Sequence, residues 1–199
     1  MYCILLAGMP ATGKSSLAKK LSAALTLPVF SKDVLKERLF DTIGFQSRAE
    51  KVRLGEAASR IIEDCADEML RAGIPFILEN NFDDVTWPTI QALFSRYDCI
   101  PLTILLTADM QTVYDRFVAR DQSPLRHRGH VVNNCYPEKE PRTAVVPLPF
   151  EGFAAAMAAR GFDRFDIGGP TLRVDTTDWS QVELADIIAW VRDQITFSA

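Results

Sequence analysis

The segment that most constrains the fold of this chain is Gly8-Met9-Pro10-Ala11-Thr12-Gly13-Lys14-Ser15, which fits the pattern G-x-x-x-x-G-K-[ST] at every fixed position. An apolar run at residues 2–7 precedes it, and Leu17, Leu21 and Leu25 follow at the spacing of an amphipathic helix. Glycines permit backbone angles that other residues avoid, so successive N–H groups can turn toward an anion where a helix begins. The pattern predicts a phosphate-binding loop between a strand and a helix; a plain glycine turn is the alternative.

The loop also predicts how a nucleoside triphosphate is held. Lys14 is expected to reach the β- and γ-phosphates, and the Ser15 hydroxyl is expected to ligate the accompanying metal ion. ATP and Mg²⁺ are therefore the predicted cofactors. The residues expected to contact the nucleotide here are Gly8, Met9, Pro10, Ala11, Thr12, Gly13, Lys14, Ser15 and Ser16.

Short apolar runs alternate with longer helical patterns along the 199 residues, which predicts a single α/β domain spanning residues 1–199. Several of the runs are apolar nearly throughout, which is typical of parallel strands buried on both faces. Hydrophobic residues make up 48% of the chain, enough to cover a central sheet on both sides. Strands are expected at residues 2–7, 28–31, 74–78, 100–107 and 171–175, the last at an edge of the sheet. Helices are expected at residues 15–26, 33–42, 47–72, 84–96, 109–121, 151–160 and 180–196.

Two connections are longer than a parallel sheet requires. Residues 33–73 contain two helical patterns where one would suffice. Residues 121–149 contain five prolines and several basic side chains, and they show no convincing period. Connections of this length are usually lids or binding loops.

Three further elements follow the phosphate loop in order: Ser31-Lys32-Asp33, the pair Arg116 and Arg120, and Arg126-His127-Arg128-Gly129-His130. Together they resemble the small P-loop kinases with an adenylate-kinase-like core, in particular ATP-dependent kinases related to chloramphenicol phosphotransferase and zeta-toxin-type kinases. The resemblance implies a three-layer P-loop NTPase fold, with a five-stranded parallel sheet of order 2-3-1-4-5, helices on both faces and a lid insertion. It also implies that residues 33–73 hold the acceptor and that residues 121–149 form the lid.

Asp33 stands just after the second strand, where ligands bind in open α/β sheets. The resemblance implies that this carboxylate accepts the proton of an attacking hydroxyl group. The alternative is a structural one, because an acidic residue in a first helical turn commonly caps the helix and complements its dipole.

Glu79 closes the third strand and is followed by Asn80 and Asn81. An acidic residue at that place resembles the one that holds Mg²⁺ in P-loop proteins, so Ser15 and Glu79 are the predicted metal ligands. A strand-end carboxylate with a purely structural partner is the alternative. Asn80 and Asn81 are candidates for binding substrate hydroxyls, although Asn also commonly ends a strand.

Arg116 and Arg120 lie four residues apart, so they project from one face of their helix. Arginine suits the charge that develops on a transferring phosphoryl group, because it stays protonated and its fork matches phosphate oxygens. We expect Arg120 also to contact the nucleotide; a solvated helix face with Asp115 and Asp121 as partners is the alternative. The predicted catalytic residues are Lys14, Asp33, Arg116 and Arg120.

The histidines and the remaining basic residues give weaker signals. Arg126 and His127 are predicted to bind the substrate along with Asp33, Asn80 and Asn81. A zinc site of His127, His130 and Cys135 would lack a fourth ligand. The basic residues near the paired helices are interpreted as their solvated side, with attraction of a phosphate or carboxylate group of the substrate as the alternative; they are Lys32, Arg48, Lys51 and Arg53.

The formal net charge of -4 gives no general attraction to a polyanion, which disfavours nucleic acid as a partner. The four cysteines are widely spaced and suit a reducing cytoplasm. We expect no export signal and no membrane span, because the longest apolar stretch, at residues 99–106, is far shorter than a bilayer requires.

These observations predict an ATP-dependent kinase that phosphorylates a hydroxyl group of a small molecule. Two alternatives share the phosphate loop: a nucleic-acid 5′-hydroxyl kinase, and a regulatory NTPase operated as a switch. The sequence indicates neither the acceptor nor an oligomeric state, because tertiary placement shapes the acceptor pocket.

Overall fold

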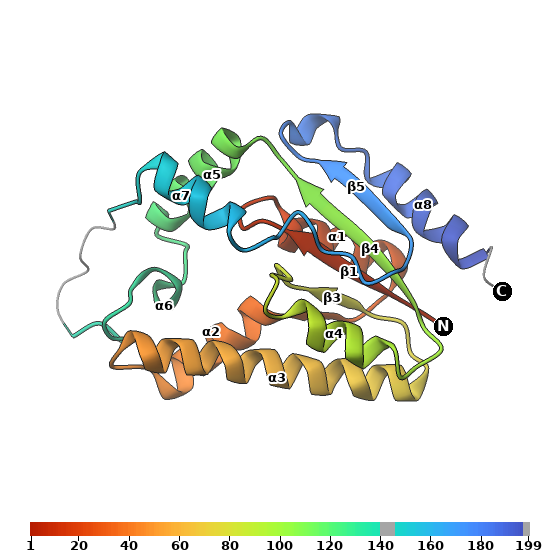
Figure 1. The fold of residues 1–199 in the computed structure, drawn as a ribbon, viewed down its shortest axis with the longest axis horizontal. Coiled ribbons are helices and arrows are strands. Elements are labelled where there is room, and N and C mark those ends of the chain that lie inside the picture. The colour runs from red at the N-terminus through yellow and green to blue at the C-terminus, as the bar shows by residue number, and fades with distance from the viewer. Residues whose placement is uncertain (140–145, 197–199) are drawn as a thin grey trace.

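A computed structural model describes residues 1–139 and 146–196 of the chain. Its centre is a five-stranded sheet in the order β2-β3-β1-β4-β5, with all neighbouring strands parallel (Figure 1). The predicted fold class and strand order are confirmed, and β5 lies at an edge as expected. The strands are β1 (Tyr2–Gly8), β2 (Val29–Ser31), β3 (Ile77–Glu79), β4 (Ile100–Thr107) and β5 (Thr171–Asp175).

Helices cover both faces of the sheet and enclose two cores (Figure 1). On one face, Leu5 and Ala7 of β1 pack with Ile62 of α3 (Arg48–Ala72) and Ile90 of α4 (Trp87–Phe94). On the other face, residues of β1 and β4 pack against α1 (Lys14–Leu25) and α8 (Leu184–Thr196). Because successive side chains of a strand point to opposite faces, the continuous apolar run of β1 fills both cores.

The remaining helices gather at the carboxyl ends of the strands (Figure 1). Tyr114 and Phe117 of α5 (Met110–Gln122) pack on Phe153 of α7 (Phe150–Ala158) with ring centroids 5.3 and 5.0 Å apart. The others are α2 (Lys32–Ile43), the short α6 (Arg128–Val131) and the 3-10 turn η1 (Trp179–Gln181).

Three predicted element boundaries are wrong, each for a local reason. The third strand begins at Ile77 rather than residue 74, because the Ile74 N–H closes the C-terminus of α3 on the Met69 carbonyl and Pro75 has no N–H to give. The segment expected at residues 84–96 begins as a helix only at Trp87, since Asp83 accepts the Thr86 N–H. The last helix is divided into η1 and α8, and Asp178 caps η1.

The long connection at residues 121–149 is folded against α2 and α3 where the structure describes it. Phe45 and Tyr136 exchange backbone hydrogen bonds of 2.8 Å, which form an antiparallel bridge. The α6 turn within this segment escaped the sequence analysis, because four residues are too few to show a period. Residues 140–145 of the predicted lid lie outside the described residues.

Candidate active site

A cavity of about 520 Å³ opens at the carboxyl ends of the strands. Its lining comes from the phosphate loop, the ends of β2 and β3, the first turns of α2, the last turns of α5 and the segment that contains α6. The sheet order creates this cavity, because β1 and β3 are neighbours and carry the phosphate loop and Glu79 to the same edge. The predicted site residues that line it are Pro10, Ala11, Gly13, Lys14, Ser15, Ser16, Asp33, Glu79, Asn80, Asn81, Arg116, Arg120 and Arg126.

The two glycines of the loop are required by its backbone and its packing. Gly8 has φ 125° and Gly13 has φ 91°, in a region that other residues rarely adopt. A Cβ on Gly8 would overlap the Leu106 carbonyl of β4, and a Cβ on Gly13 would overlap the indole of Trp179. The loop is therefore held between β4 and η1, and neither glycine can be replaced without strain.

Lys14 is buried at the centre of the loop. Its Nζ donates to the carbonyls of Gly8 and Met9, at 2.9 and 2.8 Å. Burial lowers the pKa of Lys14 to about 8, while the charges of Glu79 and Asp33 oppose the shift. The ammonium is thus placed in a dry setting where an added phosphate would be attracted strongly.

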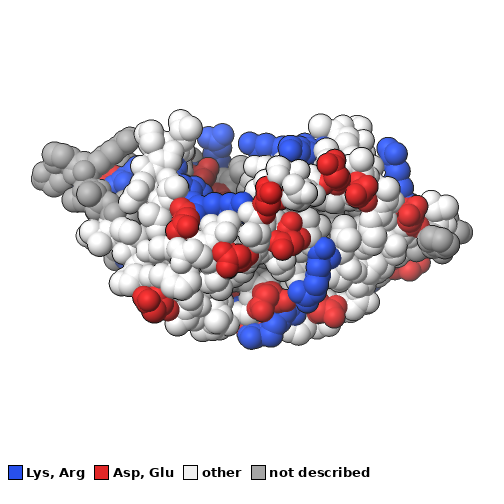
Figure 2. Space-filling view, turned by 90° about the horizontal axis from the view of Figure 1, so that it is seen from above, with Lys and Arg blue, Asp and Glu red and all other residues white. Residues whose placement is uncertain are grey.

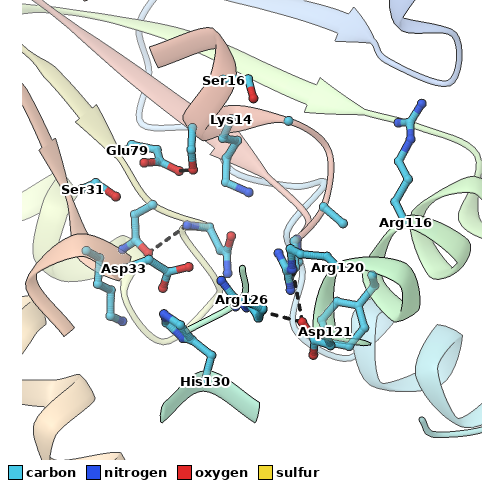
Figure 3. A pocket seen from close by; sticks show the side chains of 18 of the residues that line it. Lys14, Ser16, Ser31, Asp33, Glu79, Arg116, Arg120, Asp121, Arg126 and His130 are labelled. Atoms are coloured by element: carbon cyan, nitrogen blue, oxygen red, sulfur yellow. Dashed lines mark hydrogen bonds and ion pairs between the residues drawn. The ribbon is translucent and has the colours of Figure 1, made fainter. Parts of the chain in front are cut away.

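Ser15 and Glu79 meet across the neighbouring strands β1 and β3. The Ser15 hydroxyl donates to Glu79 Oε1 at 2.6 Å, and Glu79 is 7% exposed (Figure 3). A hydroxyl oxygen and a carboxylate oxygen side by side are a suitable donor set for Mg²⁺, which prefers hard oxygen ligands. The residues present therefore fit the predicted metal ion.

Asp33 lies in the first turn of α2, and its side chain faces the cavity (Figure 3). No side chain caps this helix, and among the described residues Asp33 accepts no hydrogen bond. Burial acts to raise the pKa of Asp33, but positive charges nearby, among them those of Arg126, Lys36 and Lys14, lower it overall. The carboxylate is thus ionised and available to a ligand, and the capping alternative has no hydrogen bond to support it.

The arginines divide into two groups. Arg120 and Arg126 converge on the cavity, and their Nε atoms lie 3.2 and 3.4 Å from the same Asp121 Oδ1 (Figure 3). Arg116 points away from them, and its guanidinium donates to the carbonyls of Thr176 and Thr177 at 2.8 and 3.0 Å (Figure 3). Arg116 ties α5 to the segment after β5, so its guanidinium points away from those of Arg120 and Arg126, although all three side chains line the cavity.

The two histidines also separate. His127 lies outside the lining of the cavity, because its Nδ1 accepts the Gly129 N–H and its Nε2 is 3.0 Å from Asp41 Oδ1. The structure therefore does not bring His127 to the other predicted substrate residues. His130 lines the cavity instead, with Nε2 3.0 Å from Glu37 Oε1. Burial lowers the pKa of His130 to about 3, so its ring is neutral at pH 7.

Within residues 1–139 and 146–196, no group of three or more His, Cys, Asp or Glu side chains is arranged to hold a metal ion. The same described residues include no helix that is long and apolar enough to cross a membrane.

Some residues near the cavity carry roles that the sequence did not suggest. Lys51 is 6% exposed, so its interpretation as part of a solvated face is wrong. Lys36 and Arg160 line the cavity and were not predicted. The spacing of Lys32, Asp33 and Lys36 was a usable signal, because residues three or four apart share a helix face. Arg160 gave no such signal, since it follows α7 and reaches the cavity only through the tertiary fold.

In Figure 2, basic side chains lie along the upper margin of the view, in the recess there and in one further group at the lower centre, whereas acidic side chains are spread across the face toward the viewer.

The fold and the cavity together define a P-loop protein of the small-kinase class, and comparisons with known proteins agree. A candidate kinase from Chloroflexus aurantiacus J-10-fl is 29% identical, with 97% of each chain covered and a TM-score of 0.80. A sugar kinase from Janibacter sp. HTCC2649 is 9% identical, with 98% of this chain and 94% of that chain covered and a TM-score of 0.54. A gluconokinase from Sinorhizobium meliloti 1021 is 13% identical, with 99% and 97% covered and a TM-score of 0.54. The last two comparisons support the fold alone.

Residues 3–133 match the model of a family described as AAA domain, and the chain belongs to that family of P-loop proteins. No curated protein matches the chain.

Proposed function

We propose that this protein is an ATP-dependent kinase that transfers the γ-phosphoryl group to a hydroxyl group of a small molecule. The observation that carries the proposal is that one cavity joins the phosphate loop, the Ser15–Glu79 pair and the ionised Asp33. The similarity to a candidate kinase at 29% identity supports it. A switch protein needs no carboxylate opposite the phosphate loop, whereas phosphoryl transfer uses one to orient the attacking hydroxyl.

Each residue has a role in this reaction. The backbone of the loop and Lys14 bind the β- and γ-phosphates, and Ser15 and Glu79 hold Mg²⁺, which supplies positive charge beside the phosphate oxygens. Asp33 accepts the hydrogen bond of the acceptor hydroxyl and takes its proton as a new O–P bond forms. The bond between the γ-phosphorus and its bridging oxygen breaks, and ADP leaves with that oxygen.

The basic side chains of the cavity act on the charge that moves in this reaction. Asp121 orients the side chains of Arg120 and Arg126. The two guanidinium groups are therefore already in place when charge develops on the transferring phosphoryl group. Asn80 and Asn81 end β3 beside Glu79, where their amides can orient an acceptor with several hydroxyl groups. All four cysteines are unpaired, which supports a cytoplasmic location.

The test is ADP release and phosphorylated product measured with sugars, polyols, nucleosides, aminoglycosides and a 5′-hydroxyl oligonucleotide. We expect release to depend on a small hydroxyl compound. Asp33→Asn should lower kcat by about 10² to 10⁴-fold with little change in ATP affinity, since the loss belongs to the chemical step.

Asp186→Asn is the matched control, because Asp186 also stands exposed in the first turn of a helix, far along the chain in α8. That variant should keep the wild-type kcat. Full activity in Asp33→Asn, ADP release that no acceptor stimulates, or preference for the oligonucleotide would each reject the proposal.

A further inference from the structure

Basic side chains from several elements line the cavity. Lys14 belongs to the phosphate loop, Arg120 to the end of α5 and Arg126 to the segment before α6. Lys32 and Lys36 flank Asp33 on α2, and Arg160 follows α7. The basic side chains whose charges act on Asp33 or on one another here, namely Lys32, Lys36, Arg126 and Arg160, are called the second basic region.

Within the second region, the arginines have acidic partners. Arg126 Nε is 3.4 Å from Asp121 Oδ1, and Arg160 is paired with Asp83. Lys32 and Lys36 differ, because among the described residues neither ammonium makes a hydrogen bond or an ion pair. The carboxylates of Asp33, Asp83 and Glu63 attract Lys32 only from a distance.

Lys36 extends toward α3, where its Cε would lie 3.5 Å from a Cβ added to Gly55. Its ammonium is 5.5 Å from the centroid of the Phe40 ring. Burial lowers the pKa of both Lys32 and Lys36, which means that their charge is poorly solvated. A buried charge without a partner raises the free energy of the protein. An anion bound beside these two ammonium groups would remove that cost, so its binding would be favourable.

We infer that the phosphate acceptor is itself an anion, whose carboxylate or phosphate group binds between Lys32 and Lys36 while its hydroxyl group lies at Asp33. The part of the inference that concerns the hydroxyl group rests on the proposed function. The part that concerns the anionic group rests on the cavity and on Lys32 and Lys36, which make no hydrogen bond or ion pair with the described residues. Lys32 and Lys36 lie four residues apart on α2 and flank Asp33, so a single compact molecule can meet all three side chains.

The γ-phosphate of the nucleotide is the competing occupant of these lysines. The phosphate loop and Lys14 are the proposed partners of that group. Lys32 and Lys36 lie on α2, the helix that carries Asp33, and not on the phosphate loop. A base must lie beside the hydroxyl group from which it takes a proton, so side chains next to Asp33 are within reach of the acceptor.

The test is binding to the full chain saturated with Mg²⁺ and a non-hydrolysable ATP analogue, so that the phosphate loop is filled. Calorimetry is carried out with D-glucitol, D-gluconate and D-glucitol 6-phosphate, which share a carbon chain and differ in charge, and with inorganic phosphate. We expect inorganic phosphate and at least one charged hexitol derivative to bind at least tenfold more tightly than neutral D-glucitol. The tighter of the two derivatives identifies a carboxylate or a phosphate as the preferred group.

Lys36→Gln and Lys32→Gln should each weaken inorganic phosphate binding by about tenfold or more, while affinity for the ATP analogue stays unchanged and shows that the fold is intact. Lys20→Gln, which removes an exposed lysine of α1, is the matched control and should bind phosphate as the wild type does. Phosphate binding that is absent or that ignores both lysines would overturn the inference, as would equal binding of D-glucitol. If the protein phosphorylates only neutral acceptors, the inference is overturned but the proposed function is supported. Lysine-dependent anion binding without transfer to any acceptor would count against the proposed function instead.

Discussion

Lys14 is the residue on which nucleotide binding depends most directly. Its ammonium lies among the loop carbonyls of Gly8 and Met9, and no apolar core requires it. We expect Lys14→Ala to weaken ATP binding by at least tenfold and to abolish transfer, because the buried charge is lost from the phosphate site. Calorimetric titration of ATP together with circular dichroism checks both affinity and fold. Unchanged affinity in a folded variant would show that the loop does not bind the phosphates.

Gly13 of the phosphate loop and Gly152 of α7 have different surroundings, so replacing each by alanine tests how closely the loop is packed. Gly13→Ala places a Cβ against Trp179 at φ 91°, so we expect a loss of about 1–3 kcal/mol in the free energy of unfolding and weaker ATP binding. Gly152 lies inside α7 with nothing within 4 Å of an added Cβ, so Gly152→Ala should stabilise by about 0.5–1 kcal/mol. Urea denaturation measures both values. A stable, nucleotide-binding Gly13→Ala variant would contradict the close packing under Trp179.

At the scale of elements, a buried lysine of α3 helps to hold the described part of the predicted lid. Lys51 Nζ donates to the carbonyls of His130 and Val132 and to Asn133 Oδ1, at 2.8, 2.6 and 3.1 Å. We expect Lys51→Met to speed amide hydrogen exchange at residues 128–133 by about tenfold or more, since it leaves the partly buried carbonyls of His130 and Val132 without this donor. Exchange followed by mass spectrometry measures this.

Arg53→Met is the control for that experiment, because Arg53 is exposed two residues further along the same helix. Equal exchange in wild type and Lys51→Met would mean that other contacts of the segment hold it.

The closure of the lid on nucleotide binding stays a prediction, and added protection of residues 123–137 by an ATP analogue would support it.

The contact of α6 with α2 makes this part of the molecule sensitive to acid. The pKa of His130 in the folded chain, about 3, lies below the ordinary histidine value of about 6.5, so between these pH values the unfolded chain binds a proton that the folded chain does not. Stability must therefore fall as the pH is lowered through this range. Asp33 favours the charged ring, whereas burial and the cations Arg126 and Lys36 oppose it.

From pH 7 to pH 5 the contribution of His130 amounts to about 2 kcal/mol of unfolding free energy. We expect His130→Gln to lose less stability than the wild type over this interval. Urea denaturation at the two pH values provides the comparison, and an identical loss in both proteins would assign the acid sensitivity to other groups.

At the scale of the whole molecule, the sequence predicted what depends on local pattern. The phosphate loop and its flanking strand and helix follow from residues close together in the chain. Ser15, Asp33 and Glu79 could be assigned to one site because the carboxyl ends of parallel strands share an edge of the sheet. The strand order itself came from resemblance, since periodicity carries no information about which strands are neighbours.

What escaped prediction depends on packing between distant segments. Lys51 looks like any lysine on an amphipathic helix until residues 130–133 fold over it. His127 stands in a basic run that suggested substrate binding, yet Asp41 and the Gly129 N–H hold its ring away from the cavity. Trp179 has no local feature that connects it with Gly13, although the two are in contact. Such pairings join residues too far apart in the chain for any spacing rule to detect.

The central position of β1 has a consequence for the newly made chain. This strand is synthesised first, but its partners are Ile77 to Glu79 on one side and Ile100 to Leu106 on the other, and the cover over Gly13 arrives only with Trp179. Until the ribosome has added the residues in between, β1 and the phosphate loop lack these native contacts. A nascent chain shorter than about 180 residues therefore has a phosphate loop without the cover of Trp179.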